Sequence, residues 1–543
     1  MELAPIIYRT SRPAPDLAHH EVLSGVYVIG GSVDVTHVTS QTNTAAILGV
    51  HGCGTIDGTL VWRTQDAERV GAMMNATSWA HLGERIRGSL TLYLLDEPRG
   101  TIAVLPDPLG AGVVFTFRDQ DSFAVSSDLQ RLSEFLAGRG KRISRSAGYS
   151  ACLIATGSGG IFPSSYEGID ALDHFQYVLV KADGVEIRDY PLKNQLFQSR
   201  ISYDECLQEV KDEVVQTTMA LLAAPHVTKI CHLTDGFDSR LLLAGIRALG
   251  GEDSFRFFCL KSPAVDRKVA EGLAATLGLT MTEYSGADWE VLPGSLEEQI
   301  LGPLVRSAGI LPGAPDIGMK SAGSLILQGG YGEFYRTFFS TDMTEAVASG
   351  GRALAARMWS SRGYPAEGES GACLFSQDFV AEVARRVDHS IEAGTSMGLR
   401  PDAIPDFLFM RYRNRYFMGT QSREWSAIGS QIDPLYGHAA LPVAYAMDLE
   451  TRRSNIFGFD LLNLLDDQLI KYPYATQAFN WKYQQLRPVP ETHSFAATSP
   501  HFDDRRAPQA RRRSGGSVPV ATAEQISRAD SMRVPSGRVA QSD

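Results

Sequence analysis

The stretch "CHLTDGFDSRLLLAGI", residues 231–246, decides how the second half of the chain folds. A short apolar run enters a polar turn, Thr-Asp-Gly-Phe-Asp-Ser, and a helical pattern begins directly after it. We expect strands over 227–233, 255–260 and 280–285, separated by helices over 239–250 and 266–278. This β-α-β-α-β order predicts an α/β fold with a doubly wound parallel sheet and helices on both faces.

The turn itself indicates a phosphate site. Ligands of such sheets bind at the carboxyl ends of the strands, where backbone N–H groups and the positive ends of helix dipoles lie. Gly236 permits close backbone approach, while Thr234 and Ser239 can add hydroxyl donors. Asp238 is well placed to hold Mg²⁺, which prefers hard oxygen ligands. For an arbitrary turn, capping of the helix by Asp238 or Ser239 would be the preferred explanation.

The pattern on either side of this stretch differs. Residues 20–130 are rich in short apolar runs bounded by Gly, Pro and Asp, which predict an antiparallel β-rich domain, and 128–140 is a predicted helix. A hairpin over 175–190 should turn at Asp183-Gly184. Ser202 and Glu205 have the spacing of a capping box at the start of a long amphipathic helix. Residues 300–485 are predicted to be mainly helical.

The composition is that of a soluble globular protein with sizeable cores. The chain has 543 residues, of which 44% are hydrophobic, and a formal net charge of −11. This negative charge argues against nucleic acid as a partner. The six cysteines form no CxxC pair, which favours reduced and mostly buried thiols. We see no secretory signal or membrane span, so we expect a cytoplasmic protein without a membrane partner.

The C-terminal segment 486–543 is predicted to be a disordered basic tail. It is rich in Arg, Ser, Pro and Gly, and it has few large apolar residues to offset its ordering entropy. Its two arginine runs, Arg505-Arg506 and Arg511–Arg513, could contact a small acidic partner, although a solvated tail is the more frequent outcome.

The segment "LTDGFDSR" (233–240) resembles the S-G-G-x-D-S pyrophosphate loop of the asparagine synthetase family. The resemblance implies that ATP and pyrophosphate bind this loop, with two further contacts at the next strand and helix. Asp235 stands where the family has glycine, and it would repel phosphate unless it turned outward or helped to hold a metal. The implied nucleotide-binding residues here are Leu233, Thr234, Asp235, Gly236, Phe237, Asp238, Ser239, Leu260 and Asp266.

A second stretch, "LILQGGYGEFYRTFF" (325–339), resembles the second metal loop of the same family. Gly329 and Gly330 give backbone freedom beside the nucleotide, and Glu333 falls near the family's acidic position. The resemblance implies that Asp238 and Glu333, from two strand ends, share Mg²⁺. A solvated Glu333 on a surface turn is the alternative. The later segment 430–453 resembles the family's helical closing region.

Residues 82–136 resemble the glutamine-hydrolysing, Ntn-hydrolase-like domain of the family, on Asp107-Pro108-Leu109-Gly110 and "FAVSSDL" (123–129). The family's nucleophile is a cysteine at position 2, whose own α-amine serves as base. Position 2 here is Glu2, so we expect no ammonia release from glutamine. The implied domains are a degenerate glutaminase-like domain (1–197), an ATP-pyrophosphatase domain with a helical C-terminal part (198–485) and the tail.

Together these resemblances imply an ATP-dependent ligase that activates a carboxylate as an acyl-adenylate and joins it to an amine. The family uses a base or a late lysine for amide formation, and Tyr331, Lys471 and Lys482 are the candidates. β-Lactam synthetases and lasso peptide cyclases have similarly degenerate N-terminal domains, so intramolecular ring closure in specialised metabolism is one expectation. Asparagine synthesis from free ammonia and a catalytically decayed scaffold remain alternatives, and a homodimer is compatible with all of them.

One further group is undecided at this stage. The segment 410–425 carries four arginines, Arg411, Arg413, Arg415 and Arg423. They could bind an anionic substrate or phosphate, and at helical spacing a solvated face explains them at least as well.

Overall fold

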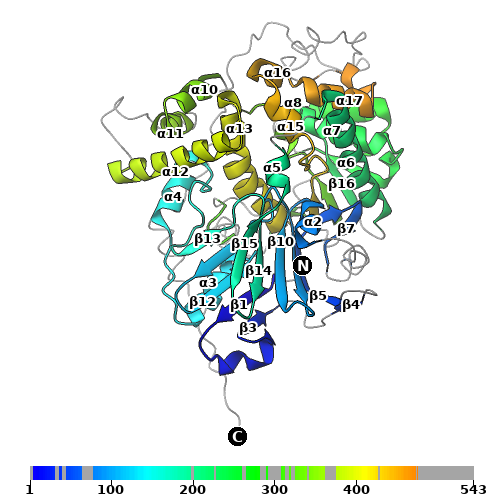
Figure 1. The fold of residues 1–543 in the computed structure, drawn as a ribbon. Helices are drawn as coiled ribbons and strands as arrows, with labels where there is room; N and C mark the ends of the chain where they lie inside the picture. Colours follow the sequence, from blue (N-terminus) through cyan, green and yellow to red (C-terminus); the bar gives the residue numbers. More distant parts are fainter. Residues whose placement is uncertain are drawn as a thin grey trace.

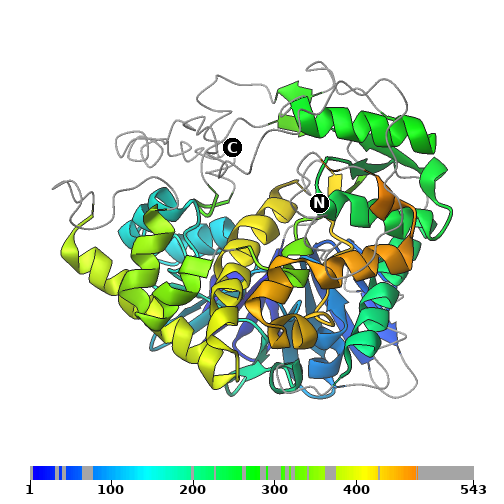
Figure 2. The same ribbon diagram turned by 90° about the horizontal axis from the view of Figure 1, so that it is seen from above.

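The molecule has two halves, one built on antiparallel sheets and the other on a parallel sheet. In the computed structural model the strand-rich N-terminal part forms one half, and the helices of the later part form the other (Figure 1). Viewed from above, these helices lie over the N-terminal strands (Figure 2). The structure describes residues 4–30, 36–39, 44–63, 66, 78–196, 201–224, 228–259, 264–281, 289–291, 307–311, 317–319, 324–338, 341–360, 375–425, 429–472 and 474.

Two six-stranded antiparallel sheets make up the N-terminal half. The first has the order β13 (Ile169–Ala171), β11 (Phe115–Arg118), β12 (Ser122–Ser126), β1 (Ile6–Thr10), β3 (Val26–Ile29), β2 (Glu21–Leu23). The second has the order β15 (Val185–Asp189), β14 (Gln176–Lys181), β10 (Thr101–Pro106), β9 (Leu90–Asp96), β5 (Thr44–Gly52), β4 (Thr36–Thr39). A small sheet, β7 (Thr59–Val61), β6 (Gly54–Ile56) and β8 (Ile86–Arg87), lies beside them.

The two large sheets pack face to face. One hydrophobic cluster joins Ile7 and Val125 of the first sheet to Ile102, Val104 and Val178 of the second. The alternate residues of β10, such as Ala103 and Leu105, belong to a second cluster on the outer face. Because both faces of β10 are covered, its sequence is a continuous apolar run.

The predicted strands and hairpin of this half are confirmed, with one shift of register. β14 and β15 pair antiparallel, as expected for residues 175–190. The turn closes between Lys181 and Gly184, which exchange two backbone hydrogen bonds of 2.8 and 3.3 Å. Its central residues are therefore Ala182 and Asp183, not Asp183 and Gly184 as predicted.

A four-stranded parallel sheet forms the centre of the second half. Its order is β17 (Phe255–Phe258), β16 (Lys229–His232), β20 (Ser324–Leu327), β21 (Gly429–Ile432), and each neighbouring pair is parallel. In chain order this is 2-1-3-4, so the direction of progression reverses between β16 and β20. A crevice opens at such a switch point, where the connections from adjacent strands leave in opposite directions.

The strand β21 corrects one sequence expectation. Its residues lie in a stretch that was predicted to be helical, yet they form the edge of the parallel sheet beside β20. Only four residues long, this strand has no alternation or apolar run that would distinguish it from a helix. The expected strand over 280–285 appears only as a bridge between Met281 and Phe257, and residues 282–285 lie outside the described part.

Helices α6 (Tyr203–Ala223), α7 (Phe237–Arg247) and α17 (Ile456–Leu465) pack against one another beside this sheet. The helix α6 begins with the predicted capping box, because Ser202 and Glu205 bond each other's backbone N–H groups. Between β17 and β20 the chain passes through α8 (Ala264–Leu277) and the antiparallel pair of β18 (Trp289–Val291) and β19 (Ile317–Met319).

The remaining described helices complete both halves. The N-terminal half has η1 (Pro15–His20), α2 (Trp79–Glu84), α3 (Leu129–Gly138), α4 (Ala147–Thr156) and α5 (Leu192–Leu196). The later part has η3 (Glu252–Ser254), η4 (Gly332–Tyr335), α10 (Thr341–Ala348), α11 (Gly351–Ser360), α12 (Gln377–Ser396), η5 (Pro401–Ala403), α13 (Ile404–Leu408), the π-helix η6 (Phe409–Gly419), α14 (Thr420–Trp425), α15 (Leu441–Ala446), α16 (Leu449–Arg453) and η7 (Leu469–Lys471).

Among the helices in the described residues, none combines the length and the apolar character that crossing a bilayer requires. The domain boundaries predicted at 197 and 485 fall on residues outside the described part and stay predictions.

Replacing Ser202 with alanine should loosen the first turn of α6. The substitution removes one side of the capping box, which contributes about 1 kcal/mol at a helix N-terminus. Amide hydrogen exchange of residues 203–208, followed by mass spectrometry, should become about fivefold faster. Ser202→Thr keeps the hydroxyl and serves as the control. Unchanged exchange in Ser202→Ala would mean that the box does not hold this helix end.

Candidate functional site

The turn after β16 is closed by its own hydroxyl groups. Ser239 Oγ accepts the backbone N–H of Thr234 at 3.0 Å and lies 3.1 Å from Thr234 Oγ1. Thr234 Oγ1 also accepts the N–H of Gly236 at 3.1 Å. The two hydroxyls that the sequence assigns to phosphate therefore hold the turn in shape, and Thr234 and Ser239 preorganise the loop.

The first turn of α7 is not capped by a side chain. Gly236 is the N-cap residue and makes no side-chain bond to the helix, and neither Asp238 nor Ser239 takes the capping role that the alternative explanation gives them. Phe237 points into the core, where its ring packs 5.0 Å from that of Phe459. The N–H groups at this helix end are thus available to an anion in the way that phosphate sites require.

Asp235 does not turn out into solvent. Its relative exposure is 9%, and its charge acts on the buried guanidinium of Arg240 and on the thiol of Cys259. Arg240 in turn donates to the backbone carbonyl of Tyr472 at 2.7 Å and lies over the ring of Tyr474. Arg240 therefore lies near enough to offset part of the negative charge that Asp235 brings to the loop.

The tips of β16 and β20 touch. A Cβ atom on Gly329 would lie 2.9 Å from Cβ of Asp238, and one on Gly332 would collide with Asp238 Oδ1. Only glycine fits these two positions without displacing the carboxylate. Glu333 follows directly, and the negative charge of Asp238 contributes to its titration. Asp238 and Glu333, which the sequence places on separate strand ends, are therefore neighbours.

Glu333 is half-buried and has one carboxylate oxygen shielded from solvent. This atom, Oε2, has no hydrogen-bond partner among the described residues. Burial raises the pKa of Glu333, and the nearby charge of Asp238 raises it further. Glu333 is therefore not the fully solvated side chain that the alternative expects.

Two site residues were missed from the sequence. Arg336 donates to both oxygens of Asp238, at 2.9 and 2.8 Å. Asp433, directly after β21, accepts the N–H groups of Tyr331 and Leu435, both at 2.9 Å, and so fixes the glycine loop. The position of Arg336, three residues after Glu333, could have indicated from the sequence that a cation lies beside the acid. No sequence feature indicated Asp433, because the strand before it was not predicted.

The three candidate catalytic residues lie in different surroundings. Tyr331 is 3% exposed in the glycine loop, and its hydroxyl has no hydrogen-bond partner within the described residues. Burial raises its pKa well above the usual range, so this phenol is a donor and not a base at neutral pH. Lys471 lies at the surface, where Nζ bonds Gln468 at 3.1 Å. Lys482 lies outside the described residues.

The neighbouring strand end is partly described. Leu260 falls outside the described residues, whereas Asp266 in the first turn of α8 acts electrostatically on His232. The ring of His232 stacks on Phe258 at 4.6 Å, and burial lowers its pKa to about 4. Asp266 thus lies beside the tips of β16 and β17, where the sequence placed it.

Asp107 of the N-terminal half is connected to the glycine loop through Tyr436. The hydroxyl of Tyr436 donates to Asp107 Oδ1, and the Tyr436 ring packs edge-on against Tyr331 with centroids 4.8 Å apart. Asp107 also accepts the N–H groups of Ala111 and Gly112 at 3.0 and 2.5 Å. Asp107, one of the residues that resemble the glutaminase domain, therefore braces the glycine loop of the other half.

Three of the four arginines in residues 410–425 attach the later part of the chain to the N-terminal half. Arg423 donates to the carbonyl of Ser127 at 2.7 Å, and Arg411 pairs with Asp173 at 2.6 Å. Arg415 donates to the carbonyls of Gly110 and Leu172. These partners all belong to the N-terminal half, so the three arginines hold η6 and α14 against it and do not form a solvated face. Arg413 lies over the ring of Phe417, and its positive charge acts on Glu333.

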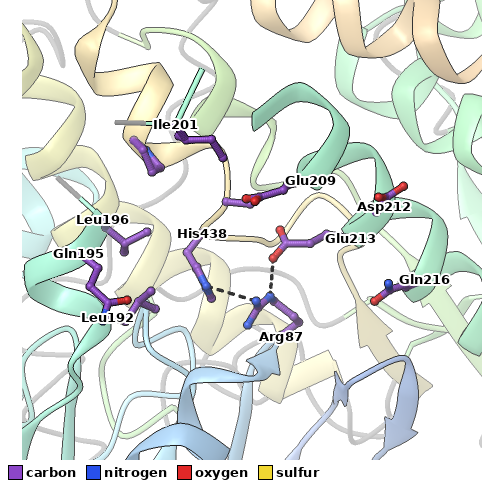
Figure 3. Close-up of a pocket in the computed structure, with 12 residues that line it drawn as sticks. Arg87, Leu192, Gln195, Leu196, Ile201, Glu209, Asp212, Glu213, Gln216 and His438 are labelled. Carbon is purple, nitrogen blue, oxygen red and sulfur yellow. Dashed lines mark hydrogen bonds and ion pairs between the residues drawn. The ribbon is translucent and has the colours of Figure 1, made fainter. Parts of the chain in front are cut away.

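A cavity of about 430 Å³ opens between the two halves, away from the strand tips (Figure 3). Arg87 of β8 crosses it to Glu213 of α6 at 2.8 Å and to Nε2 of His438 at 3.2 Å. Because Arg87 can only donate, Nε2 of His438 accepts. The exposed acids Glu209 and Asp212 line the same cavity. His438 follows Asp433 by five residues, so one segment borders both the cavity and the site.

The described residues contain no group of three or more His, Cys, Asp or Glu side chains arranged to hold a metal ion. The cysteines described form no disulfide, and all of them are buried: Cys53, Cys152, Cys206, Cys231 and Cys259. The expected metal site is thus limited, on the protein side, to two carboxylates.

Comparison with known proteins adds little. No family model matches the chain, and neither does any curated protein. Among solved structures it is similar to the glutamine phosphoribosylpyrophosphate amidotransferase of B. subtilis complexed with ADP and GMP, at 8% identity and a TM-score of 0.21 over 65% of this chain and 72% of that one. An allosteric regulatory enzyme of purine biosynthesis matches at 9% identity and a TM-score of 0.19, over 66% and 72%. Likeness this weak carries no argument about fold or function.

Asp107 should make stability depend on pH. Burial raises its pKa to about 7, against about 4 in an unfolded chain. The folded protein therefore keeps a proton that the unfolded chain has already released, and stability falls as pH rises from about 4 to about 7. Asp107→Asn removes this titration, so its melting temperature should fall less than that of the wild type between pH 5 and pH 7.

Asp183→Asn, an exposed acid in the same half, is the matched control and should follow the wild type. Parallel melting curves for wild type and Asp107→Asn across this range would show that Asp107 ionises in the folded protein as it does in the unfolded chain.

Proposed function

We propose that this chain is an ATP-dependent ligase that activates a carboxylate as an acyl-adenylate and transfers the acyl group to an amine. One observation carries the proposal. Asp238 and Glu333 meet at the switch point of a parallel sheet, directly beside an uncapped helix N-terminus. This combination of phosphate donors and acids is what binding of a metal–nucleotide requires.

In this proposal the turn after β16 holds the pyrophosphate portion of ATP. Thr234 and Ser239 shape the loop through their mutual hydrogen bonds, and the N–H groups that follow Gly236 face the phosphates. Asp235 stays buried beside Arg240, whose positive charge reduces the repulsion between this carboxylate and phosphate. We also propose that this part of the chain is a doubly wound domain similar to that of asparagine synthetases.

The carboxylates of Asp238 and Glu333 are suitable ligands for Mg²⁺ once Asp238 is released from Arg336. Glu333 offers a buried oxygen that lacks a protein partner, and Gly332 leaves room beside Asp238. Two carboxylates with remaining ligands from phosphate and water are a usual set for this ion. When bound, the metal would neutralise charge on the phosphates. Asp238, however, is already paired with Arg336, so this pair must open first.

The amine should come from a source other than glutamine. Position 2 of this sequence is Glu2, where the glutaminases of the resembled family have their cysteine. The N-terminal half has a second use here, since Asp107 and Tyr436 brace Tyr331 in the glycine loop. Tyr331, as a buried phenol with an available proton, can donate a hydrogen bond to a substrate oxygen. An amine within the substrate, as in lasso peptide cyclases, and free ammonia both fit.

Asp238→Ala should abolish ATP–pyrophosphate exchange. Loss of one of the two carboxylates should weaken binding of Mg²⁺, whose charge would stabilise the transition state, and should lower the exchange rate by about 100-fold or more. Exchange would be measured with a panel of amino acids and carboxyl-terminal peptides. Asp253→Ala, an exposed acid at the opposite end of the same sheet, is the control and should exchange like the wild type. Equal exchange by Asp238→Ala and wild type would contradict the site.

A decayed scaffold is the second candidate, and the Arg336–Asp238 pair favours it. A permanently closed pair would leave the site without a metal ligand. Binding of a fluorescent ATP analogue with and without Mg²⁺ separates the two functions and needs no knowledge of the acid. Mg²⁺-dependent binding that Asp238→Ala loses supports the ligase. Absence of both this binding and exchange supports the scaffold.

A further inference from the structure

The cation nearest to the proposed metal ligand is part of the protein. Arg336 Nη1 lies 2.9 Å from Asp238 Oδ1, and Nη2 lies 2.8 Å from Oδ2. The guanidinium plane therefore covers both acceptor oxygens in the two-pronged geometry that makes arginine–carboxylate pairs strong. Both side chains are largely buried, with 15% and 21% exposure, so solvent screens this pair weakly.

The surroundings hold Arg336 in this position. The next two residues, Thr337 and Phe338, donate to Asp406 Oδ1 at 2.9 and 3.1 Å. Asp406 is fixed by Arg452 at 2.8 Å, and the Phe338 ring stacks on Phe409. The guanidinium itself lies 5.7 Å from the ring centre of Phe237, at the start of α7. The pair with Asp238 is therefore built into the fold and is not a chance contact between mobile side chains.

The Arg336–Asp238 pair leaves one carboxylate oxygen of Glu333 uncovered. The Oε2 atom of Glu333 has no hydrogen-bond partner among the described residues, and Glu333 directly follows Gly332, which touches Asp238. A metal ion can therefore use this oxygen as one ligand. To take Asp238 as a second ligand, the ion must displace the guanidinium from the same two oxygens.

We propose that Arg336 and a divalent metal ion compete for Asp238, so that Arg336 keeps the site closed to free metal until the metal arrives with nucleotide. The inference rests on the proposed function, because it takes Asp238 as a metal ligand. Once displaced, the guanidinium lies beside the phosphates of the bound nucleotide, and its planar fork matches phosphate oxygens as well as it matches a carboxylate. Arg336 is thus a positioning residue that makes metal binding depend on nucleotide.

The test measures metal binding without nucleotide. Mn²⁺ serves as the probe, and its free concentration is followed by electron paramagnetic resonance with the full-length chain at pH 8. The wild type should bind Mn²⁺ weakly. Arg336→Gln, which frees both carboxylate oxygens of Asp238, should bind Mn²⁺ at least about tenfold tighter. The double variant Arg336→Gln with Asp238→Asn should lose this gain.

Arg247→Gln is the matched control. Arg247 lies on the same helix, α7, and pairs with Asp466 at 2.5 Å, far along the helix from the strand tips. This variant removes a similar ion pair and should bind Mn²⁺ as weakly as the wild type. A folded Arg336→Gln variant that binds Mn²⁺ no more tightly than the wild type would overturn the competition.

A second variant covers the case in which Arg336→Gln does not fold. Arg336→Lys keeps the positive charge but presents a single point of contact instead of the fork. Its melting temperature should rise more on addition of Mn²⁺ than that of the wild type, and an equal rise would overturn the inference. ATP–pyrophosphate exchange tests the proposed function separately. A gain in Mn²⁺ binding without any exchange would defeat the ligase and support the competition.

Discussion

The site depends on two carboxylates being held together in a buried place. Asp238 lies in the first turn of α7 and Glu333 in η4, shortly after the neighbouring parallel strands β16 and β20, and the glycines opposite Asp238 allow the two segments to touch. Such a pair repels itself, and burial makes the repulsion stronger because little solvent screens it. The fold compensates with Arg336 on one carboxylate, and burial raises the pKa of the other. In the chemistry that we propose, the metal ion of a metal–nucleotide would take over this neutralisation.

The same constraint explains why the two halves are attached so firmly. The glycine loop that carries Glu333 is held from one side by Asp433 and from the other by the Tyr331–Tyr436 contact, which ends on Asp107. Buried arginines from η6 and α14 add donors to carbonyls of the N-terminal half. A loop that must keep two acids in register needs rigid support. The N-terminal half therefore has a physical task, which is to brace the loop of the other half.

Charge within the site is balanced by cations that are themselves fixed by residues far away in the sequence. Asp235 meets Arg240, which is anchored on the carbonyl of Tyr472. Arg336 is placed by the Asp406–Arg452 pair behind it. The segment after β21 borders both the strand tips, at Asp433, and the interdomain cavity, at His438. Each balancing group is fixed by a second interaction, so the cluster keeps one arrangement.

The sequence alone determined the strand–turn–helix at residues 227–250 and the capping box of Ser202 and Glu205, because both depend on local pattern. That Asp238 and Glu333 belong to one site was implied by the family resemblance. The sequence did not reveal the strand β21, which is four residues long and has no distinguishing period. It left the arginines of residues 410–425 undecided, since helical spacing looks the same whether a face meets solvent or another part of the protein. Only the tertiary structure decided that Arg336 covers Asp238, that Asp433 holds the glycine loop, and that Asp235 is buried beside a cation. Those outcomes depend on contacts between residues up to about a hundred positions apart, and no local pattern encodes such contacts.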